Sequence, residues 1–197
     1  MGEMSAEKRE GAALGIALLH YPVYDKNRRI VATAVTNLDL HDIARLAKTY
    51  ALSFYYVVTP LPEQREICQR IINHWRNGWG ATYNPKRREA LELVTVVATL
   101  DEAIKDMSLR CARPVKTIAT GAKGAPNCIT YQEMSEKIRE AAVDHLLLLG
   151  TGWGLAEQVT STADYVLAPI SGRSDYNHLS VRSAASIIVD RLMGDSR

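Results

Sequence analysis

Cysteines are few in this sequence, long apolar runs are absent, and neither sign of charge is in strong excess. The three cysteines, Cys68, Cys111 and Cys128, are widely spaced and form no Cys-x-x-Cys or Cys/His cluster. We therefore expect neither a disulfide framework nor a metal site. No apolar stretch reaches the roughly 18 residues that a membrane span needs, and nothing resembles a signal peptide. A soluble, cytoplasmic protein without membrane contact is predicted.

The charge balance excludes few classes of protein. The formal net charge of +2 is too small to indicate nucleic-acid binding by itself, although it allows a local basic patch. The apolar fraction of 47% is ordinary for a globular protein and sufficient for a buried core. No repeat, low-complexity tract or linker run interrupts the chain. We expect one domain over residues 14–197, preceded by a flexible leader over residues 1–13.

Strand-like apolar runs alternate with amphipathic stretches of helical spacing. Strands are predicted over residues 14–19, 30–35, 54–58, 91–98 and 116–119 and near residues 145–150 and 165–168, and helices over residues 39–50, 63–75, 100–108 and 130–141 and at the C-terminus. Asn37 or Asp39 is the expected N-cap of the first helix. This alternation predicts an α/β fold, a mostly parallel sheet covered by helices on both faces.

The last fifty residues contain two strands that end in glycine-containing loops. The run HLLLLGTGWGL ends in Gly150, Gly152 and Gly154, which is typical of a buried parallel strand opening into a loop whose backbone closely approaches a ligand. The second strand precedes a Pro-Ile-Ser-Gly turn, a polar loop and a helix. Together they predict a nucleotide-sized pocket at the carboxyl edge of the sheet.

Four motifs carry a family resemblance. Residues 147–155 match a strand ending in an LxxG-x-x-x-GL loop, residues 169–172 a P-I-x-G loop, and residues 177–181 an Asn-x-x-Ser-Val segment that starts the last helix. Asn37 precedes a helix that bears Arg45, within TNLDLHDIARLAKTYAL. In this arrangement the chain resembles the SPOUT class of RNA methyltransferases.

The resemblance covers roughly residues 14–192 and implies several properties. The fold would be an α/β sheet with a deep C-terminal trefoil knot, which is rare among proteins. The cofactor would be S-adenosylmethionine (SAM), held in the knot, and a homodimer would complete the active site on tRNA or rRNA. GTGWGL and DYNHLSVRSA resemble a small bacterial SPOUT subfamily for which RNA-methyltransferase activity is inferred. Ribose-methylating members usually carry a glutamate where this chain has Thr151-Gly152-Trp153, a departure that leaves the substrate open.

The predicted cofactor site combines free glycine backbone, an apolar slot and aromatic rings. Leu149, Ile170 and Leu179 would form the slot for adenine, and Trp153 or Tyr176 would face the sulfonium cation. GTGWGL could instead be a plain strand-to-helix turn with a core tryptophan, but the neighbouring motifs favour a cofactor site. The predicted cofactor-binding residues are Thr120, Leu149, Gly150, Thr151, Gly152, Trp153, Gly154, Pro169, Ile170, Gly172, Tyr176, Asn177, Leu179 and Ser180.

Methyl transfer from sulfur is an in-line displacement, so the protein mainly positions the nucleophile and manages one proton. Arg45 follows His41 by one helical turn, so both can face one site. Arg45 matches the arginine thought to help activate the 2′-hydroxyl in ribose-methylating SPOUT enzymes, and Asn37 belongs to the same motif. Because arginine, with a pKa above about 12, is a poor base, a phosphate or substrate contact would assist it. The alternative is a solvated ion pair with Asp42.

Asp175 is a second catalytic candidate, in the loop between Gly172 and Asn177. The guanine-N1 branch of the class uses an aspartate near the start of its last helix as a base, and Asp175 is comparably placed. It could equally be a loop or N-cap aspartate. His178 could also serve as a base, although a lone histidine is more often structural. Ribose 2′-O-methylation is favoured, with guanine-N1 methylation or a non-catalytic SAM- and RNA-binding protein as alternatives.

Basic side chains in loops near predicted strand ends could converge into an RNA-phosphate surface, or could be single solubilising charges. The predicted RNA-binding residues are Arg28, Lys123, Arg173 and Arg182. The segment HWRNGWG, residues 74–80, contains two tryptophans close to Lys86-Arg87-Arg88. Stacking on a splayed base is one use of such residues. Packing over the sheet or at a dimer interface is commoner, and we expect packing here.

Overall fold

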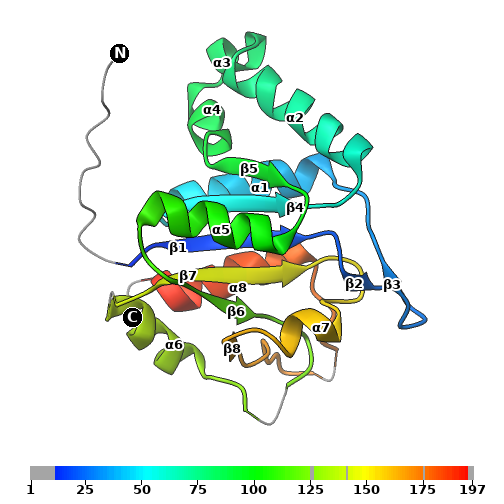
Figure 1. The fold of residues 1–197 in the computed structure, drawn as a ribbon, viewed down its shortest axis with the longest axis vertical. Coiled ribbons are helices and arrows are strands. Elements are labelled where there is room, and N and C mark those ends of the chain that lie inside the picture. The colour runs from blue at the N-terminus through cyan, green and yellow to red at the C-terminus, as the bar shows by residue number, and fades with distance from the viewer. Residues whose placement is uncertain (1–11, 125–126, 141, 175, 195–197) are drawn as a thin grey trace.

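The computed structural model describes residues 12–124, 127–140, 142–174 and 176–194. Six parallel strands form one sheet in the order β5-β4-β1-β7-β6-β8 (Figure 1), so the predicted α/β fold with a parallel sheet is confirmed. The strands of this sheet are β1 (Leu14–Leu19), β4 (Phe54–Val58), β5 (Val94–Val97), β6 (Val115–Ala119), β7 (Asp144–Gly150) and β8 (Tyr165–Val166). A separate antiparallel hairpin consists of β2 (Val23–Tyr24) and β3 (Ile30–Val31).

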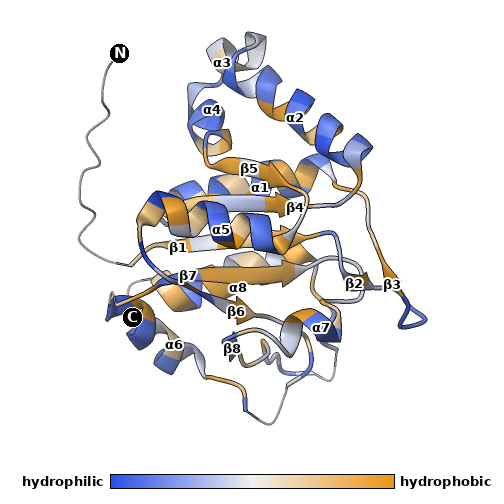
Figure 2. Ribbon diagram, in the orientation of Figure 1, coloured by the Kyte–Doolittle hydropathy of each residue, from blue (hydrophilic) through white to orange (hydrophobic). Residues whose placement is uncertain are grey.

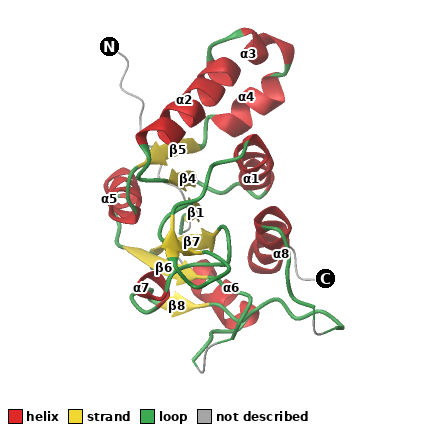
Figure 3. Ribbon diagram, turned by 90° about the vertical axis from the view of Figure 1, so that its right-hand side faces the viewer, coloured by secondary structure: helices red, strands yellow, loops and turns green. Residues whose placement is uncertain are grey.

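Helices cover both faces of the sheet, as predicted (Figure 3). They are α1 (Asn37–Thr49), α2 (Pro62–Arg76), α3 (Trp79–Tyr83), α4 (Pro85–Leu91), α5 (Leu100–Cys111), α6 (Tyr131–Arg139), α7 (Glu157–Thr160) and α8 (Val181–Met193). The buried residues of α1, α2, α4, α6 and α8 share one core cluster, and those of α5 and α7 share a second cluster on the opposite face. Of the helices described, none is both long and apolar enough to cross a membrane.

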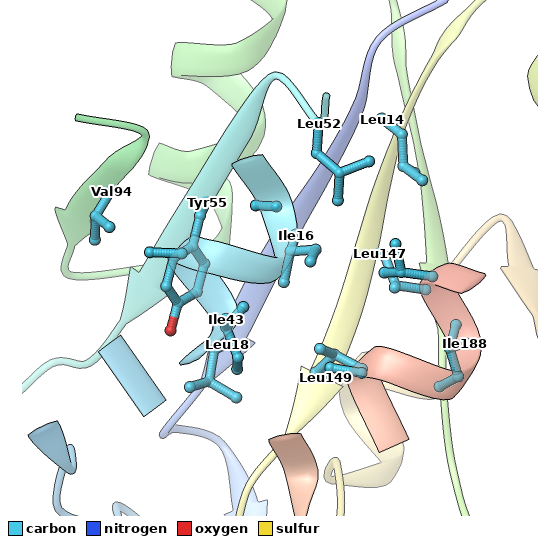
Figure 4. Packing of buried hydrophobic residues seen from close by; sticks show 14 of the residues in the cluster. Leu14, Ile16, Leu18, Ile43, Leu52, Tyr55, Val94, Leu147, Leu149 and Ile188 are labelled. Carbon is cyan, nitrogen blue, oxygen red and sulfur yellow. The ribbon is translucent and has the colours of Figure 1, made fainter. Parts of the chain in front are cut away.

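The central strand β1 explains why the core has two halves. All six of its residues are buried, because β4 and β7 flank it and helices cover both of its faces. Its Leu14, Ile16 and Leu18 pack with Ile43 of α1 and Ile188 of α8 (Figure 4). Since burying one such side chain contributes roughly 2 kcal/mol, the strand anchors the domain. In Figure 2 most strands of the sheet are coloured apolar or neutral, and the helices around them alternate between hydrophilic and hydrophobic residues.

The helices α3 and α4 were not predicted from the sequence. The predicted strand over residues 91–98 starts only at Val94, because Leu91 still belongs to α4. Asn84 caps α4 by accepting a hydrogen bond from the Arg87 backbone N–H at 3.0 Å, and Pro85 occupies the first turn. These are ordinary helix-start signals, hidden in a short polar segment.

Two expectations for the start of the chain differ from the structure. The N-cap of α1 is Thr36, whose hydroxyl accepts from the Asp39 backbone N–H at 3.1 Å, and neither Asn37 nor Asp39. The predicted strand over residues 30–35 is reduced to β3. Most of the predicted leader lies outside the described residues, but Ala13 is buried and donates its N–H to Asp144 Oδ1 at 2.7 Å.

The carboxyl ends of β1, β6, β7 and β8 meet at one edge of the sheet. The chain runs outward from β1 to β5, crosses to β6, and returns to insert β7 between β1 and β6. Such a change of direction places loops on either side of a crevice, where open α/β sheets bind ligands. The loops that follow β6, β7 and β8 all lie at this edge.

Candidate functional site

The loop after β7 is clamped by the β2–β3 hairpin. The Trp153 N–H donates to the Tyr24 carbonyl at 2.9 Å, and the Tyr24 N–H donates to the Gly154 carbonyl at 2.9 Å. Gly152 and Gly154 have φ angles of +59° and +98°, which favour glycine. A Cβ at Gly152 would also lie only 2.9 Å from the Tyr24 oxygen. The sequence therefore needs glycine here for backbone shape and for close approach.

Partly buried polar groups hold the base of the same loop through hydrogen bonds. Thr151 Oγ1 lies 3.1 Å from the Leu19 carbonyl and 2.5 Å from Thr33 Oγ1, which in turn lies 3.0 Å from His20 Nδ1. Burial lowers the pKa of His20 to about 4, so the ring is neutral at pH 7. The Thr151 side chain, predicted to bind cofactor, is thus hydrogen-bonded within the protein. His20 and Thr33 were not identified from the sequence as part of this site.

The loop after β6 and the start of the C-terminal segment approach the β7 loop. Thr120 Oγ1 donates to the Leu148 carbonyl at 2.8 Å, and Asn177 Nδ2 donates to the Ala122 carbonyl at 2.9 Å. The rings of Trp153 and His178 lie 5.5 Å apart. The predicted cofactor residues from three separate loops are therefore brought together at one edge.

The exposed apolar side chains of these loops are unusual for a protein surface. Trp153, Tyr176 and Leu179 are 58%, 75% and 44% exposed. Large apolar groups gathered beside free backbone are typical of a ligand site. Ile170 is half-buried against the core. Leu149, predicted to line the adenine slot, packs in the core instead, because the alternation along β7 turns its side chain toward Ile188 of α8 (Figure 4).

An ion-pair cluster joins the N-terminal halves of α1 and α8. The Arg182 guanidinium donates to Asp39 Oδ1 at 2.8 Å, and its Nε lies 3.3 Å from Asp42 Oδ2. Arg182, predicted to contact RNA, therefore has carboxylates of the protein as its partners. Asp42 was the alternative partner of Arg45, which is exposed on α1 and has no ion pair among the residues that the structure describes.

Arg45 lies near enough for its charge to act on His41, but the His41 ring is not exposed beside it. The His41 ring packs edge-on against Trp75 of α2 at 5.3 Å between centroids and is buried. Burial, together with the nearby Arg87 guanidinium, lowers the pKa of His41. Asn37, the first residue of α1, is exposed.

The remaining predicted site residues lie around the same edge of the sheet, except for one that lies outside the described residues. Arg28 is exposed in the hairpin, with its guanidinium 4.0 Å from the centre of the Tyr24 ring. Lys123 and Arg173 are exposed in the loops that follow β6 and β8. Asp175 lies outside the described residues. Within the described part of the chain, no cluster of three or more His, Cys, Asp or Glu side chains could hold a metal ion.

A family model described as SAM-dependent RNA methyltransferase matches residues 13–194. The chain belongs to this family. A protein from Aquifex aeolicus, described as uncharacterized, is 43% identical over 182 residues, which cover 92% of this chain and 89% of that protein. A tRNA (guanine-N(1)-)-methyltransferase from Oleidesulfovibrio alaskensis is 44% identical over 189 residues, which cover 96% of this chain but only 44% of that protein.

The fold is also that of known methyltransferases. The SpoU methyltransferase AviRb from Streptomyces viridochromogenes, crystallised with AdoMet, aligns with a TM-score of 0.56 at 18% identity, covering 94% of this chain and 61% of that one. The predicted SPOUT-class α/β knot fold is therefore confirmed. Family membership likewise confirms the predicted SAM cofactor and RNA methyltransferase activity.

The described residues fit this cofactor. A Cβ built at Gly154 or Gly172 would meet no protein atom within 4 Å, so both loops have open space on the side where a ligand can approach. Trp153 and Tyr176 are exposed beside this space, and an aromatic face attracts a cation such as a sulfonium. SAM, when bound, supplies a methyl group activated by its positively charged sulfur.

Proposed function

We propose that this SAM-dependent methyltransferase modifies the ribose 2′-hydroxyl of a nucleotide in tRNA or rRNA. The observation that carries the proposal is the exposure of Arg45. Asp42, the alternative ion-pair partner of Arg45, pairs with Arg182 instead. An exposed guanidinium is a strong donor to phosphate and to a developing alkoxide. We also propose that the chain belongs to the bacterial subfamily with the GTGWGL and DYNHLSVRSA motifs.

The chain's own residues have three tasks in this reaction. The loops after β6, β7 and β8 hold the methyl donor in one orientation, which removes much of the entropic barrier. Arg45 and Asn37 hold the ribose and its phosphate. His178, exposed and beside Trp153, would accept the proton that the 2′-hydroxyl loses as the methyl group passes from the SAM sulfur to its oxygen. Exposed Arg28, Lys123 and Arg173 contact further phosphates.

Mass spectrometry of digested RNA nucleosides, from cells with and without the protein, tests the chemistry. A 2′-O-methylated nucleoside that disappears with the gene supports the proposal. Arg45→Ala should abolish it, while Lys48→Ala, an exposed change one turn along the same helix, should not. Equal activity of Arg45→Ala and the parent would exclude the assigned role.

Guanine-N1 methylation is the second candidate. The Oleidesulfovibrio alaskensis protein and one from Nitratidesulfovibrio vulgaris, 43% identical over 190 residues, are named tRNA (guanine-N(1)-)-methyltransferase. This chain spans 44% of the length of each, so the named activity belongs to proteins with a second, unmatched part. Under this candidate the base is Asp175. The product is then 1-methylguanosine, lost in Asp175→Ala but retained in His178→Ala.

We further propose that the protein is a cytoplasmic homodimer, as the resemblance to the SPOUT class implies, and that residues 14–197 form one domain. Sedimentation equilibrium at micromolar concentration measures the mass of the assembly directly. A species of twice 21.8 kDa is expected. A monomer that methylates RNA at full rate would contradict the dimer.

A further inference from the structure

The short helix α3 presents two stacked aromatic rings to solvent. Trp79 and Tyr83 lie one helical turn apart, with ring centroids 4.7 Å apart and planes inclined by 20°. They are 69% and 68% exposed, so most of both rings faces solvent. The sequence led us to expect packing for both tryptophans of HWRNGWG. Trp75 does pack, half-buried among His41, His74 and Arg87. For Trp79, the prediction that it packs over the sheet is wrong.

Two glycines explain why the rings point outward. A Cβ at Gly80 would lie 2.7 Å from the Trp75 indole, and a Cβ at Gly78 would lie 2.7 Å from the His74 carbonyl. The glycine face of α3 therefore rests directly on α2, which turns Trp79 and Tyr83 away from it. Asn84 then leads without a break into α4, so the pair is held between two helices.

The chain segment that carries this aromatic pair is rich in basic residues. Residues 67–88 contain five arginines and lysines and no aspartate or glutamate, whereas the rest of the chain has 19 basic and 22 acidic residues. Among the described residues, exposed Arg70, Lys86 and Arg88 form ion pairs only with glutamates three or four positions away in the sequence. Such exposed pairs contribute little, so a phosphate can replace the glutamate.

We propose that Trp79 and Tyr83 form a stacking platform for an unpaired RNA base, with Lys86, Arg88 and Arg70 receiving the adjacent phosphates. Base stacking on exposed rings beside basic side chains is how proteins grip single-stranded RNA with little sequence preference. The positive charge disfavours docking of a second copy through this same face. The proposal rests on the proposed RNA substrate.

The platform contacts a different part of the RNA from the methylated nucleotide. In Figures 1 and 3, α3 lies at one end of the long axis of the molecule, beyond the β5 edge, while α7 and the β8 segment lie at the other. The platform therefore contributes to RNA affinity and not to the chemical step. A variant should raise the KM for RNA and leave kcat and SAM binding unchanged.

The test measures binding of a fluorescein-labelled unstructured 12-nucleotide RNA and of unfractionated tRNA by fluorescence anisotropy. Trp79→Ala and Tyr83→Ala should each weaken binding about ten-fold, and Trp79→Phe should restore most of it. Leu109→Ala, an exposed change on α5, is the matched control and should change nothing. Lys86→Ala should lower the slope of log affinity against log salt by about one.

Unchanged RNA affinity in both aromatic variants would overturn the proposal. So would a loss of self-association in Trp79→Ala with RNA binding intact, because the surface would then bind protein. Calorimetric SAM binding and methyl transfer to the same RNA, measured in parallel, report on the proposed function separately. Aromatic-dependent RNA binding without any methylated product would retain the platform and reject the proposed function.

Discussion

Gly152→Ala is expected to damage the cofactor site without disturbing the core. Alanine at a φ of +59° costs about 1 kcal/mol. Its Cβ would lie 2.9 Å from the Tyr24 carbonyl oxygen, where ordinary contacts begin at 3.4 Å. The oxygen must therefore move, which weakens its hydrogen bond with the Trp153 N–H, worth about 1 kcal/mol net. The combined cost is about 2 kcal/mol.

This cost can appear in two measurable ways. If the loop keeps its shape, the melting temperature without cofactor falls by about 4–8 °C. If the loop rearranges instead, the Kd for SAM, measured by calorimetry, rises about 30-fold. Gly154→Ala is the control for strain alone, because its φ is +98° but no atom lies within 4 Å of the new Cβ. It should lose about half as much stability.

Two results would refute this reasoning about Gly152. Parental SAM affinity together with a parental melting temperature would mean that the loop tolerates the side chain. Equal destabilisation by Gly154→Ala in the absence of cofactor would mean that the collision with Tyr24 contributes nothing.

Two further predictions concern buried polar groups. The pKa of His20 falls from 6.5 to about 4 on folding, so the fold keeps its full stability above pH 6.5 and loses about 3 kcal/mol of unfolding free energy as the pH drops to 4. Urea titrations across this pH range should show that the pH dependence disappears in His20→Asn. An unchanged pH dependence in that variant would contradict the prediction. Asp39→Asn, which deprives Arg182 of a buried carboxylate, should cost about 2 kcal/mol, against less than about 1 kcal/mol for the exposed Asp42→Asn. Equal losses in these two variants would show that burial of Asp39 does not matter.

Much of the fold could be predicted because burial leaves a clear local pattern. The apolar runs of β1 and β7 and the amphipathic spacing of α1, α2 and α5 mark elements whose ends differ from the predictions by only a few residues. The pattern failed at α3 and α4. Both helices are short, α3 lies against α2 through glycines, and α4 buries only Ala90 and Leu91, so no apolar periodicity marks them.

The candidate site was predictable in part. Gly152 and Gly154 could be selected because positive φ angles are rare for other residues, and the structure has both. The predictions for Leu149 and Arg182 were wrong because each side chain points toward another part of the protein. Leu149 points into the core because strand alternation turned it there, and Arg182 meets Asp39 across two helices that are 143 residues apart at the contact. The Arg182–Asp39 contact in particular joins residues far apart in the sequence, so no local spacing predicts it.

The sequence by itself indicated two things: an α/β fold, from its apolar periodicity, and a resemblance to SAM-dependent methyltransferases, from its motifs. Local backbone requirements and apolar periodicity are properties of neighbouring residues, so they survive in the sequence. Only the tertiary structure decided which charges are free. It paired Asp42 with Arg182 and left Arg45 exposed, and it packed Trp75 half-buried while exposing Trp79 beside Tyr83. Those outcomes depend on contacts between distant elements, which no local pattern records.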